Sequence, residues 1–536
     1  TTQSFILLTS REIITCEETQ KNDKIRLRGD DLKVAFPAQM REIDKKIIEG
    51  GVPSLLLMEE AARSVFEEIQ RHAVSRAVVL CGSGNNGGDG YGAARLLLGH
   101  GTDVAVVRCY TPTSDDCKRN AAIYGSLGGP AVDLEETSVA ENLLGSADII
   151  VDAVFGTGFH GSLEGNTAKL FEFVNRLKTY RLAVDIPSGV SGFDGSASDS
   201  SFKADKTVTF GLAKVGHFLY PGCAFCGEIL IEGAGFPKRI MNSLADSEVI
   251  DEEVISALLP ERPRNSYKGS YGSVLIIGGC EIYTGAPYLS ALGAFRSGCG
   301  MVYSYTPGGS ASVIQNNLPE AIALVSDGDF LGPGDIKHLS KLMDRIDCIV
   351  VGPGVGRKEE SVEFVLQLLR SFPDKSFIVD ADGLFAISKD LSVLSRSMEI
   401  LITPHPGEFG RLNEGRTDLE SFMEFCSIHG TSAILKGASS VFCNGSGKIS
   451  INTAGNTGLA KAGSGDLLSG SIAGFAAQTG DLDQSAILGM YFMGRAAELS
   501  SVSEPCNSAS RIADSFSLVF KQFEQNAKER LHGTRP

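Results

Sequence analysis

The feature that most constrains this chain is the alternation of short apolar runs with longer amphipathic segments. The apolar runs come in two series, separated by a charged stretch: Ala77–Cys81, Val104–Val107, Ile149–Val151, Leu182–Ile186 and Thr207–Phe210, then Ser273–Ile277, Met301–Tyr305, Cys348–Val351, Phe377–Asp380, Ile400–Ile402 and Ala433–Leu435. Helical patterns lie between them, for example at Ser54–His72 and Gly92–Gly99. Such alternation is typical of βαβ units. We predict an α/β protein with two doubly wound, three-layer αβα domains.

The boundary between the two series lies in the charged stretch Asp246–Arg264, which contains Pro260 and Pro263. We therefore expect one domain at residues 1–245 and a second at 246–536 of the 536-residue chain. Each part is large enough for one doubly wound domain. Residues 1–34 carry no evident motif and are expected to form a peripheral extension.

Charge and composition exclude several classes of partner. The net charge is −16, and a chain this acidic repels nucleic acid and anionic lipid. No apolar run approaches the ~20 residues that span a bilayer, so we expect a cytoplasmic protein without nucleic-acid or membrane partners. The twelve cysteines are scattered except for Cys223 and Cys226. A lone CxxC lacks the second pair of a structural zinc site, and reduced cysteines are expected.

Glycine makes up 62 of the 536 residues, about 12% against a usual 7%, and it gathers after the apolar strands. The stretch Gly82–Gly90 contains GxGxxG at Gly82, Gly84 and Gly87. A dinucleotide-binding Rossmann site also needs an acidic residue about 20 residues further on. The next strand ends in Val107-Arg108-Cys109 without a carboxylate, which disfavours a plain Rossmann site.

Two acidic clusters follow later strands of the first half. They are Asp152-Ala153-Val154-Phe155-Gly156-Thr157-Gly158 and Asp185-Ile186-Pro187-Ser188-Gly189, with the two carboxylates 33 residues apart. Each Asp alone could cap a following helix. Three clusters at matching strand ends instead favour a shared crevice, where Asn, Asp and Ser oxygens suit a hard cation of undetermined identity.

These clusters resemble the NAD(P)H-hydrate epimerase domain, and Gln39–Asp44 and Leu57–Glu59 also fit its pattern over about residues 35–240. The resemblance implies a Rossmann-like domain that interconverts the R and S forms of NADHX and NADPHX, cofactors hydrated at nicotinamide C6. It implies a potassium ion bound by Asn86, Asp152 and Ser188. The implied substrate contacts are Asn85, Asn86, Gly87, Gly88, Asp89, Gly156, Thr157, Gly158, Phe159, His160, Gly161, Ser162 and Asp185.

Asp185 is the candidate for proton transfer, because a carboxylate facing the nicotinamide end could act as a base. Lys214 is a weaker candidate for its partner. A surface lysine is an equally good interpretation at that position.

In the second half, Gly463-Ser464-Gly465-Asp466 stands where a helix would begin. The glycines allow backbone N–H groups to face an anion at the helix N-terminus. Asp466 could cap the helix. It could instead accept a proton from a hydroxyl that attacks a phosphoryl group, and the flanking glycines favour this catalytic role.

Three other strand ends carry polar residues. His405 stands between two prolines on a stiff loop, and Lys436-Gly437-Ala438-Ser439-Ser440 suits adenosine or phosphate contacts. Asp380 and Asp382 could support Mg²⁺, through water because magnesium keeps several waters. There is no Walker motif in the sequence.

The second half resembles the ribokinase-like superfamily and, within it, the ADP/ATP-dependent NAD(P)H-hydrate dehydratase family. The residues that carry this resemblance are Tyr267–Gly272, Tyr283–Pro287, Gly352–Gly356, Thr403–Glu408, Lys436–Ser440 and Gly463–Asp466. It implies nucleotide contacts at Lys436, Gly437, Ala438, Ser439, Ser440 and Gly465, and hydrate contacts at Ala286, Gly356, His405 and Asp466, with Asp466 as base. Lys461 and Met493-Gly494 depart from the family pattern, which leaves the shape of the nucleotide end open.

Together the two resemblances imply a bifunctional repair enzyme. The first half would convert R-NAD(P)HX to the S form, and the second would dehydrate the S form with ADP or ATP, using K⁺ and Mg²⁺. A ribokinase-like kinase for a vitamin precursor is the alternative, as is a first half that has lost turnover and only binds. The expected partners are small molecules and further copies of the chain in a homo-oligomer.

Overall fold

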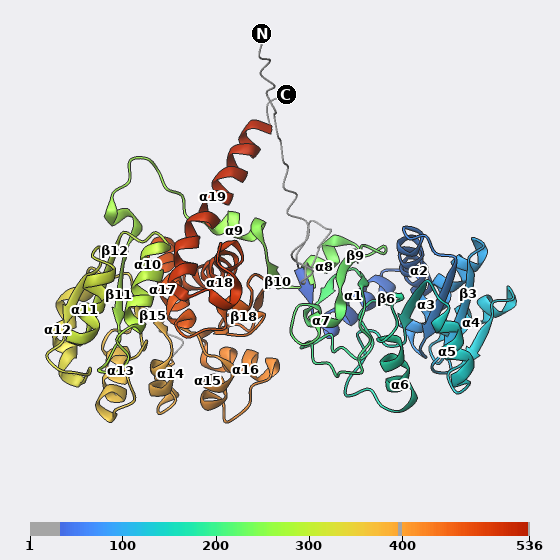
Figure 1. The fold of residues 1–536 in the computed structure, drawn as a ribbon, viewed down its shortest axis with the longest axis horizontal. Helices are drawn as coiled ribbons and strands as arrows, with labels where there is room; N and C mark the ends of the chain where they lie inside the picture. The colour runs from blue at the N-terminus through green and yellow to red at the C-terminus, as the bar shows by residue number, and fades with distance from the viewer. Residues whose placement is uncertain (1–32, 395–398, 534–536) are drawn as a thin grey trace, which may run out of the picture.

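The computed structural model describes residues 33–394 and 399–533. Its α/β architecture confirms the predicted fold class. In Figure 1 the segments of the first half occupy one side of the molecule and those of the second half the other. Most of the predicted extension, residues 1–32, lies outside the described residues. No helix in the described ranges is long and apolar enough to cross a membrane.

The first half is built on a seven-stranded parallel sheet. Helices α2, α3 and α4 pack on one face and α5 and α6 on the other. In spatial order the strands are β4 (Ala131–Asp133), β3 (Asp103–Arg108), β2 (Arg76–Cys81), β5 (Ile149–Ala153), β6 (Tyr180–Val184), β7 (Lys206–Phe210) and β9 (Glu228–Glu232). The helices are α2 (Ser54–Gln70), α3 (Asn85–Gly99), α4 (Asp115–Ser126), α5 (Thr137–Gly145) and α6 (Gly165–Val174).

The start of α3 differs from the prediction. The helix begins at Asn85 and not at Gly92, so the glycine-rich cluster forms its first turns. Close packing explains why glycine is used there: a Cβ atom on Gly87 would lie 2.1 Å from the carbonyl oxygen of Gly82, and one on Gly90 would lie 2.5 Å from Cβ of Ala153. Tertiary packing here overrides the low helix propensity of glycine.

The second half is built on a larger sheet of twelve strands. In spatial order these are β13 (Ile322–Val325), β12 (Met301–Thr306), β11 (Ser273–Ile277), β14 (Cys348–Val351), β15 (Ser376–Val379), β16 (Ile400–Ile402), β17 (Ser432–Leu435), β18 (Ser440–Cys443), β19 (Ile449–Asn452), β10 (Ser247–Ile250), β1 (Lys33–Ala35) and β8 (Ala213–Lys214). The first seven pair in parallel, and β17–β18 and β18–β19 pair antiparallel.

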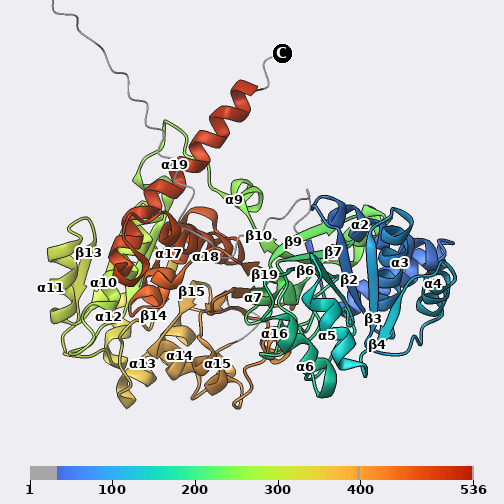
Figure 2. The same ribbon diagram turned by 45° about the vertical axis from the view of Figure 1, so that its right-hand side comes forward.

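Helices cover both faces of this sheet (Figure 2). One apolar core contains residues of α9 (Glu252–Leu258), α10 (Ala286–Arg296), α11 (Gly308–Asn317), α17 (Ser464–Thr479), α18 (Leu482–Leu499) and α19 (Ala509–Gly533). The core on the opposite face contains residues of α12 (Ile336–Met343), α13 (Glu359–Ser371), α14 (Asp382–Ile387), α15 (Pro406–Leu412) and α16 (Leu419–His429).

The large sheet does not stop at the predicted domain boundary. Strands β1 and β8, both from the first half, continue it beyond β10, with β1 antiparallel to β10 and parallel to β8. The remaining helices of this region are α1 (Pro37–Glu49), α7 (Cys223–Cys226) and α8 (Lys238–Leu244). Division at residue 245/246 stays a prediction, and the two halves share one sheet across it.

The described cysteines are all free, as expected. Cys226 is buried in the short helix α7, and burial raises the pKa of its thiol.

Candidate active sites

The first candidate site is a cavity of about 490 Å³ in the first half. It lies beside the carboxyl ends of β2, β5 and β6, where ligands bind in open α/β sheets. Its polar lining includes Asp44, Ser83, Asn85, Asn86, Asp89, Asp116, Thr157, Asp185 and Lys214, and its apolar lining includes Met40, Phe155, Phe159, Phe210 and Phe236.

The predicted substrate contacts are only partly brought together. Asn85, Asn86, Asp89, Gly156–Phe159 and Asp185 line the cavity. Gly87 and Gly88 lie in the first turns of α3 outside the lining, and residues 160–162 are exposed outside it. Helix α1 also contributes Asp44 to the lining, a contribution that the sequence did not predict although Asp44 belongs to the motif that resembles the family.

Asp185 and Lys214 form a buried ion pair in this cavity. Lys214 Nζ donates to Asp185 Oδ1 at 2.5 Å and to Thr209 Oγ1 at 2.7 Å, and its side chain is only 2% exposed. Burial opposes ionisation of Asp185, but Lys214, with help from the hydroxyl of Thr209, holds the pKa of that carboxyl below its usual value. Lys214 is thus the buried partner of Asp185, which excludes the surface-lysine interpretation.

His217 fixes both residues of the pair through the backbone. Its Nδ1 accepts from the N–H of Lys214 at 3.1 Å, so Nε2 carries the proton and donates to the carbonyl of Asp185 at 3.0 Å. Burial lowers the pKa of His217 to about 3, which keeps the ring neutral. Asp185 itself has a φ of 66°, a left-handed conformation that a side chain rarely adopts. Such strain at a strand end is typical of functional sites.

The polar side chains of Asp152, Ser188 and Asn86 lie near the ion pair. Asp152 is fully buried on β5, where it accepts hydrogen bonds from Ser188 N, Ser188 Oγ and Val154 N. Within the described residues no cationic side chain pairs with it. Burial raises the pKa of Asp152 to about 6. Both amide atoms of Asn86 are buried without a hydrogen-bond partner, as expected of a side chain that awaits a ligand.

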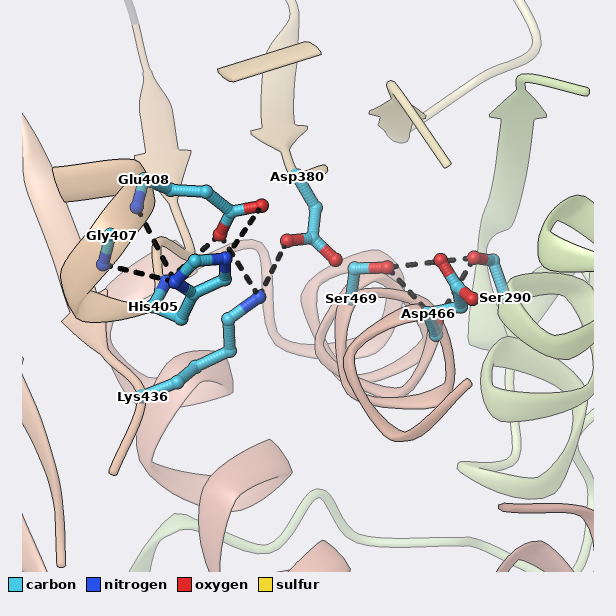
Figure 3. Close-up of polar contacts among 8 residues, drawn as sticks. All are labelled: Ser290, Asp380, His405, Gly407, Glu408, Lys436, Asp466 and Ser469. Atoms are coloured by element: carbon cyan, nitrogen blue, oxygen red, sulfur yellow. Dashed lines mark hydrogen bonds and ion pairs between the residues drawn. The ribbon is translucent and has the colours of Figure 1, made fainter. Parts of the chain in front are cut away.

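The second candidate site centres on Asp466 in the first turn of α17 (Figure 3). Ser290 and Ser469 both donate to its carbonyl oxygen at 2.9 Å, which fixes the backbone. The carboxyl group makes no hydrogen bond within the described part of the chain. Burial, together with nearby Asp380, raises the pKa of Asp466 to about 7. A carboxyl of this kind is poised to take up a proton near neutral pH.

Lys436 neutralises part of the acidic surroundings. Its Nζ lies 2.8 Å from Asp380 Oδ1 and 3.8 Å from Glu408 Oε2 (Figure 3). Burial disfavours the charged form of Lys436, but these two carboxylates raise the pKa of Lys436 and keep it a cation. A Cβ atom on Gly465 would lie 3.3 Å from Lys436 Nζ. The glycine therefore leaves room for a ligand beside the lysine.

His405 serves first as the N-cap of α15. Its Nδ1 accepts from the N–H groups of Gly407 and Glu408 at 3.0 and 3.3 Å, and Nε2 of the exposed ring lies 3.6 Å from Glu408 Oε1. The two carboxylates predicted to support Mg²⁺, Asp380 and Asp382, differ in how many of their oxygens already accept hydrogen bonds. Asp382 is bound by Arg357 Nε at 2.7 Å and by the N–H of Gly356 at 3.2 Å, whereas Asp380 keeps Oδ2 without a described partner.

One residue of the predicted nucleotide loop contacts the first half instead. Ser439 Oγ donates to the carbonyl of Phe218 at 2.6 Å. Phe218 directly follows the turn that carries His217. The hydroxyl of Ser439 is thus already engaged, and the loop is tied to the element beside the Asp185 site.

Comparison with known proteins identifies the family of both halves. Residues 274–514 match the family model "NAD(P)H-hydrate dehydratase", and residues 54–216 match "YjeF-related protein N-terminus". A curated relative from Moorella thermoacetica, "Bifunctional NAD(P)H-hydrate repair enzyme Nnr", is 34% identical over 490 residues, which cover 86% of this chain and 91% of the relative. The chain belongs to this repair-enzyme family.

The family assignment confirms the resemblance found in the sequence for both halves. A relative of the same name from Thermofilum pendens is 33% identical over 87% of this chain and 92% of its own length. Among solved structures, "ADP/ATP-dependent NAD(P)H-hydrate dehydratase from Bacillus subtilis co-crystallized with ATP/Mg2+" is 31% identical, with a TM-score of 0.45. It covers 51% of this chain and 98% of that protein.

Proposed function

We propose that the chain repairs hydrated nicotinamide cofactors in two steps: epimerisation of R- and S-NAD(P)HX at the Asp185 site, and nucleotide-dependent dehydration of the S form at the Asp466 site. The observation that carries this proposal is a separate, strand-end site with a Lys–Asp ion pair in each half of a chain that a member of the family matches over 86% of its length. An epimerase beside a dehydratase that consumes one epimer lets both forms be recovered.

In the dehydratase step, Asp466 accepts the proton of the C6 hydroxyl as the hydroxyl oxygen attacks the terminal phosphoryl group of ADP or ATP. The bond from that phosphorus to the rest of the nucleotide breaks, and AMP or ADP leaves. The C6–O bond then breaks as inorganic phosphate leaves, and loss of a C5 proton forms the C5–C6 double bond of NAD(P)H. The unbonded carboxyl of Asp466, with its pKa raised to about 7, supports the role of base. Ala286, Gly356 and His405 complete the proposed hydrate site.

The nucleotide is held by residues 436–440 together with Gly465. The N-terminus of the sixteen-residue helix α17 lies at this point, and the buried Ser464 Oγ has no hydrogen-bond partner. A helix N-terminus with free donors favours phosphate. The cation of Lys436 adds positive charge. Because Ser439 Oγ is engaged by Phe218, its proposed contact to the nucleotide is through the backbone.

Asp380, whose Oδ2 has no hydrogen-bond partner among the described residues, would hold Mg²⁺ through water, because Mg²⁺ keeps several waters. The ion would neutralise charge on the transferred phosphoryl group. Asp382 is a poorer ligand than the sequence suggested, because Arg357 and Gly356 already bind both of its oxygens.

In the epimerase site, Asp185 is the proposed base and Lys214 keeps it ionised. Potassium would be held by the amide oxygen of Asn86, the carboxylate of Asp152 and the hydroxyl of Ser188. The fit is supported by the orphaned amide of Asn86 and by the lack of a described cation beside the buried Asp152. The ion would supply a fixed positive charge close to the substrate. Asn85, Asp89 and Gly156–Phe159 line the cavity and are proposed substrate contacts.

Purified R- and S-NADHX, incubated separately with the protein, Mg²⁺, K⁺ and either ADP or ATP, test the proposal. Absorbance at the NADH wavelength should recover from both forms, and comparison of the two nucleotides decides which is used. A stable phosphorylated product without NADH would instead indicate a ribokinase-like kinase. The homo-oligomeric state and cytoplasmic location expected from the sequence stay predictions, the first of which light scattering can test.

A further inference from the structure

Helix α1 brings a second carboxyl into the epimerase cavity. Strand β1 pairs in parallel with β8 so that Ala35 is the partner of Lys214, and α1 begins two residues later at Pro37. Met40, Asp44 and Ile48 follow at intervals of four residues, which places them along one face of the helix. All three line the cavity that contains Asp185. The same strand pairing thus positions both Lys214 and Asp44.

The two carboxyl groups differ in what already binds them. Asp185 accepts hydrogen bonds from Lys214 Nζ and Thr209 Oγ1, and from the N–H of Thr157 at 3.4 Å. The carboxyl group of Asp44, a half-buried residue of α1, makes no hydrogen bond or ion pair with any residue in the described ranges. Its carboxyl is therefore available to a ligand in the cavity, whereas one oxygen of Asp185 is committed to the lysine.

The charged groups that share the cavity with Asp44 are Asp185, Lys214, Asp89, Asp116 and Arg41. Burial raises the pKa of Asp44 to about 6, with Lys214 lowering it and Asp185 raising it. The pKa of Asp185 is instead held below its usual value. Two carboxyls in one site whose environments separate their pKa values can serve as acid and base in the same reaction.

Inversion at C6 of the hydrate requires both an acid and a base. When the C6–O bond breaks, the lone pair of the ring nitrogen forms a C=N bond and the hydroxyl needs a proton to leave as water. When water adds to the other face, a new C6–O bond forms, the nitrogen regains its lone pair and the water gives up a proton. Water and protons balance, and no oxidant or reductant is consumed.

We propose that Asp44 is a second catalytic carboxyl of the epimerase site, giving its proton to the departing C6 hydroxyl while Asp185 accepts the proton of the incoming water. The two exchange roles in the reverse direction, and proton exchange with solvent restores the starting state after each turnover. This assignment rests on the proposed epimerase function. It adds a residue that the family resemblance gave no role.

Asp89 is the competing carboxyl, since it also lines the cavity without a described hydrogen bond to its side chain. It is more deeply buried than Asp44, at 9% exposure, and lies one turn of α3 beyond Asn86. Its position next to the proposed ion site favours a structural or binding role. Asp89→Asn therefore belongs in the same experiment.

The test measures epimerisation of purified R-NADHX by chromatography, without nucleotide, for the wild type, Asp44→Asn, Asp44→Glu, Asp89→Asn and Glu42→Gln. Glu42 is an exposed acid on the same helix outside the cavity lining and serves as the matched control. Asp44→Asn should lower kcat by about 10²–10⁴-fold with little change in KM. Asp44→Glu should restore part of the rate, and Glu42→Gln should match the wild type.

The pH profile separates a catalytic role from a structural one. Wild-type activity should fall as the pH rises above about 6, where Asp44 loses its proton, and this limb should vanish in Asp44→Asn. Dehydration of S-NADHX by each variant reports that the chain is folded. The inference is overturned if Asp44→Asn keeps its rate within threefold, or if the limb persists there and vanishes in Asp89→Asn. A wild type that dehydrates the S form but does not epimerise would overturn the epimerase proposal itself.

Discussion

Lys214 Nζ lies 2.5 Å from Asp185 Oδ1, although the lysine stands on β8 of the large sheet and the aspartate follows β6 of the small one. The contact joins the two sheets at the epimerase cavity. It depends on β1, which pairs with both β8 and β10. The ion pair of the proposed epimerase site is thus built where the two halves of the chain meet.

Replacing Lys214 with Met should lower both the epimerase activity and the free energy of unfolding. Loss of the lysine leaves the buried carboxylate of Asp185 unpaired, which costs about 3–5 kcal/mol, and epimerisation should fall by at least 10²-fold. Because the pKa of Asp185 is lowered in the folded state, its ionised form stabilises the fold at pH values above the pKa of an aspartate in the unfolded chain. This stabilisation is lost as the pH falls through the pKa of Asp185 in the folded state. The deficit measured by urea unfolding should therefore shrink below pH ~4.

The exposed Lys203 provides the matched control for this variant. Lys203→Met should leave stability and both activities near wild type. Equal effects of the two substitutions would contradict the role of the buried pair.

The dehydratase should lose activity as pH falls through about 7. Asp466 must be ionised to accept a proton, and burial and Asp380 raise its pKa to about 7. Asp380→Asn removes a carboxylate that raises the pKa of Asp466. It also removes the partner of Lys436, whose positive charge lowers the pKa of Asp466. The fall of kcat/KM on the acid side should therefore move to lower pH. The exposed Asp344→Asn is the control. An acid limb at the same pH in all three proteins would rule out Asp466 as the titrating base.

Potassium should stabilise the fold through Asn86 and Asp152. Binding to the folded state alone adds about 2.7 kcal/mol at a hundredfold excess over Kd, so Tm should be higher in KCl than in choline chloride at equal ionic strength. Asn86→Ala and Asp152→Asn should abolish this difference. The exposed Asn242→Ala should preserve it. If neither site variant alters the salt-specific shift, the ion binds elsewhere.

Ser439→Ala should weaken the contact between the halves without impairing nucleotide binding. Its hydroxyl donates to Phe218 at 2.6 Å, and the loss of one such hydrogen bond costs about 0.5–1.5 kcal/mol. The KM for the nucleotide should stay near wild type because the hydroxyl is not free to bind phosphate. A large rise in KM with unchanged stability would show that the hydroxyl leaves Phe218 for the nucleotide.

Much of the fold was predictable because buried parallel strands are continuous apolar runs. Ser273–Ile277, Cys348–Val351 and Ile400–Ile402 have the predicted bounds. The predicted strand Leu182–Ile186 instead ends at Val184, because Asp185 turns the backbone into a left-handed conformation. β1 and β8, of three and two residues, are too short to give a hydrophobic period.

The sequence could predict those site residues that stand in a motif directly after a predicted strand. Asp185, Asp152 and Asp466 could be chosen because glycine-rich motifs surround them. Lys214 could be named only as a weaker candidate for the partner of Asp185, beside an equally good surface-lysine interpretation, because the pairing depends on which sheet β8 joins. The place of Asp44 in the cavity depends on the same short strands, and the hydrogen bond from Ser439 to Phe218 is likewise tertiary. The cap formed by His405 is a local contact with the next three residues.

The account is tested most directly by giving R- and S-NADHX separately to Asp185→Asn and Asp466→Asn, with Mg²⁺, K⁺ and nucleotide present. Asp185→Asn should still form NADH from the S form and recover the R form only at its spontaneous rate. Asp466→Asn should form NADH from neither but still interconvert the two. The account is contradicted if Asp185→Asn converts the R form at the wild-type rate, or if Asp466→Asn keeps full dehydratase activity.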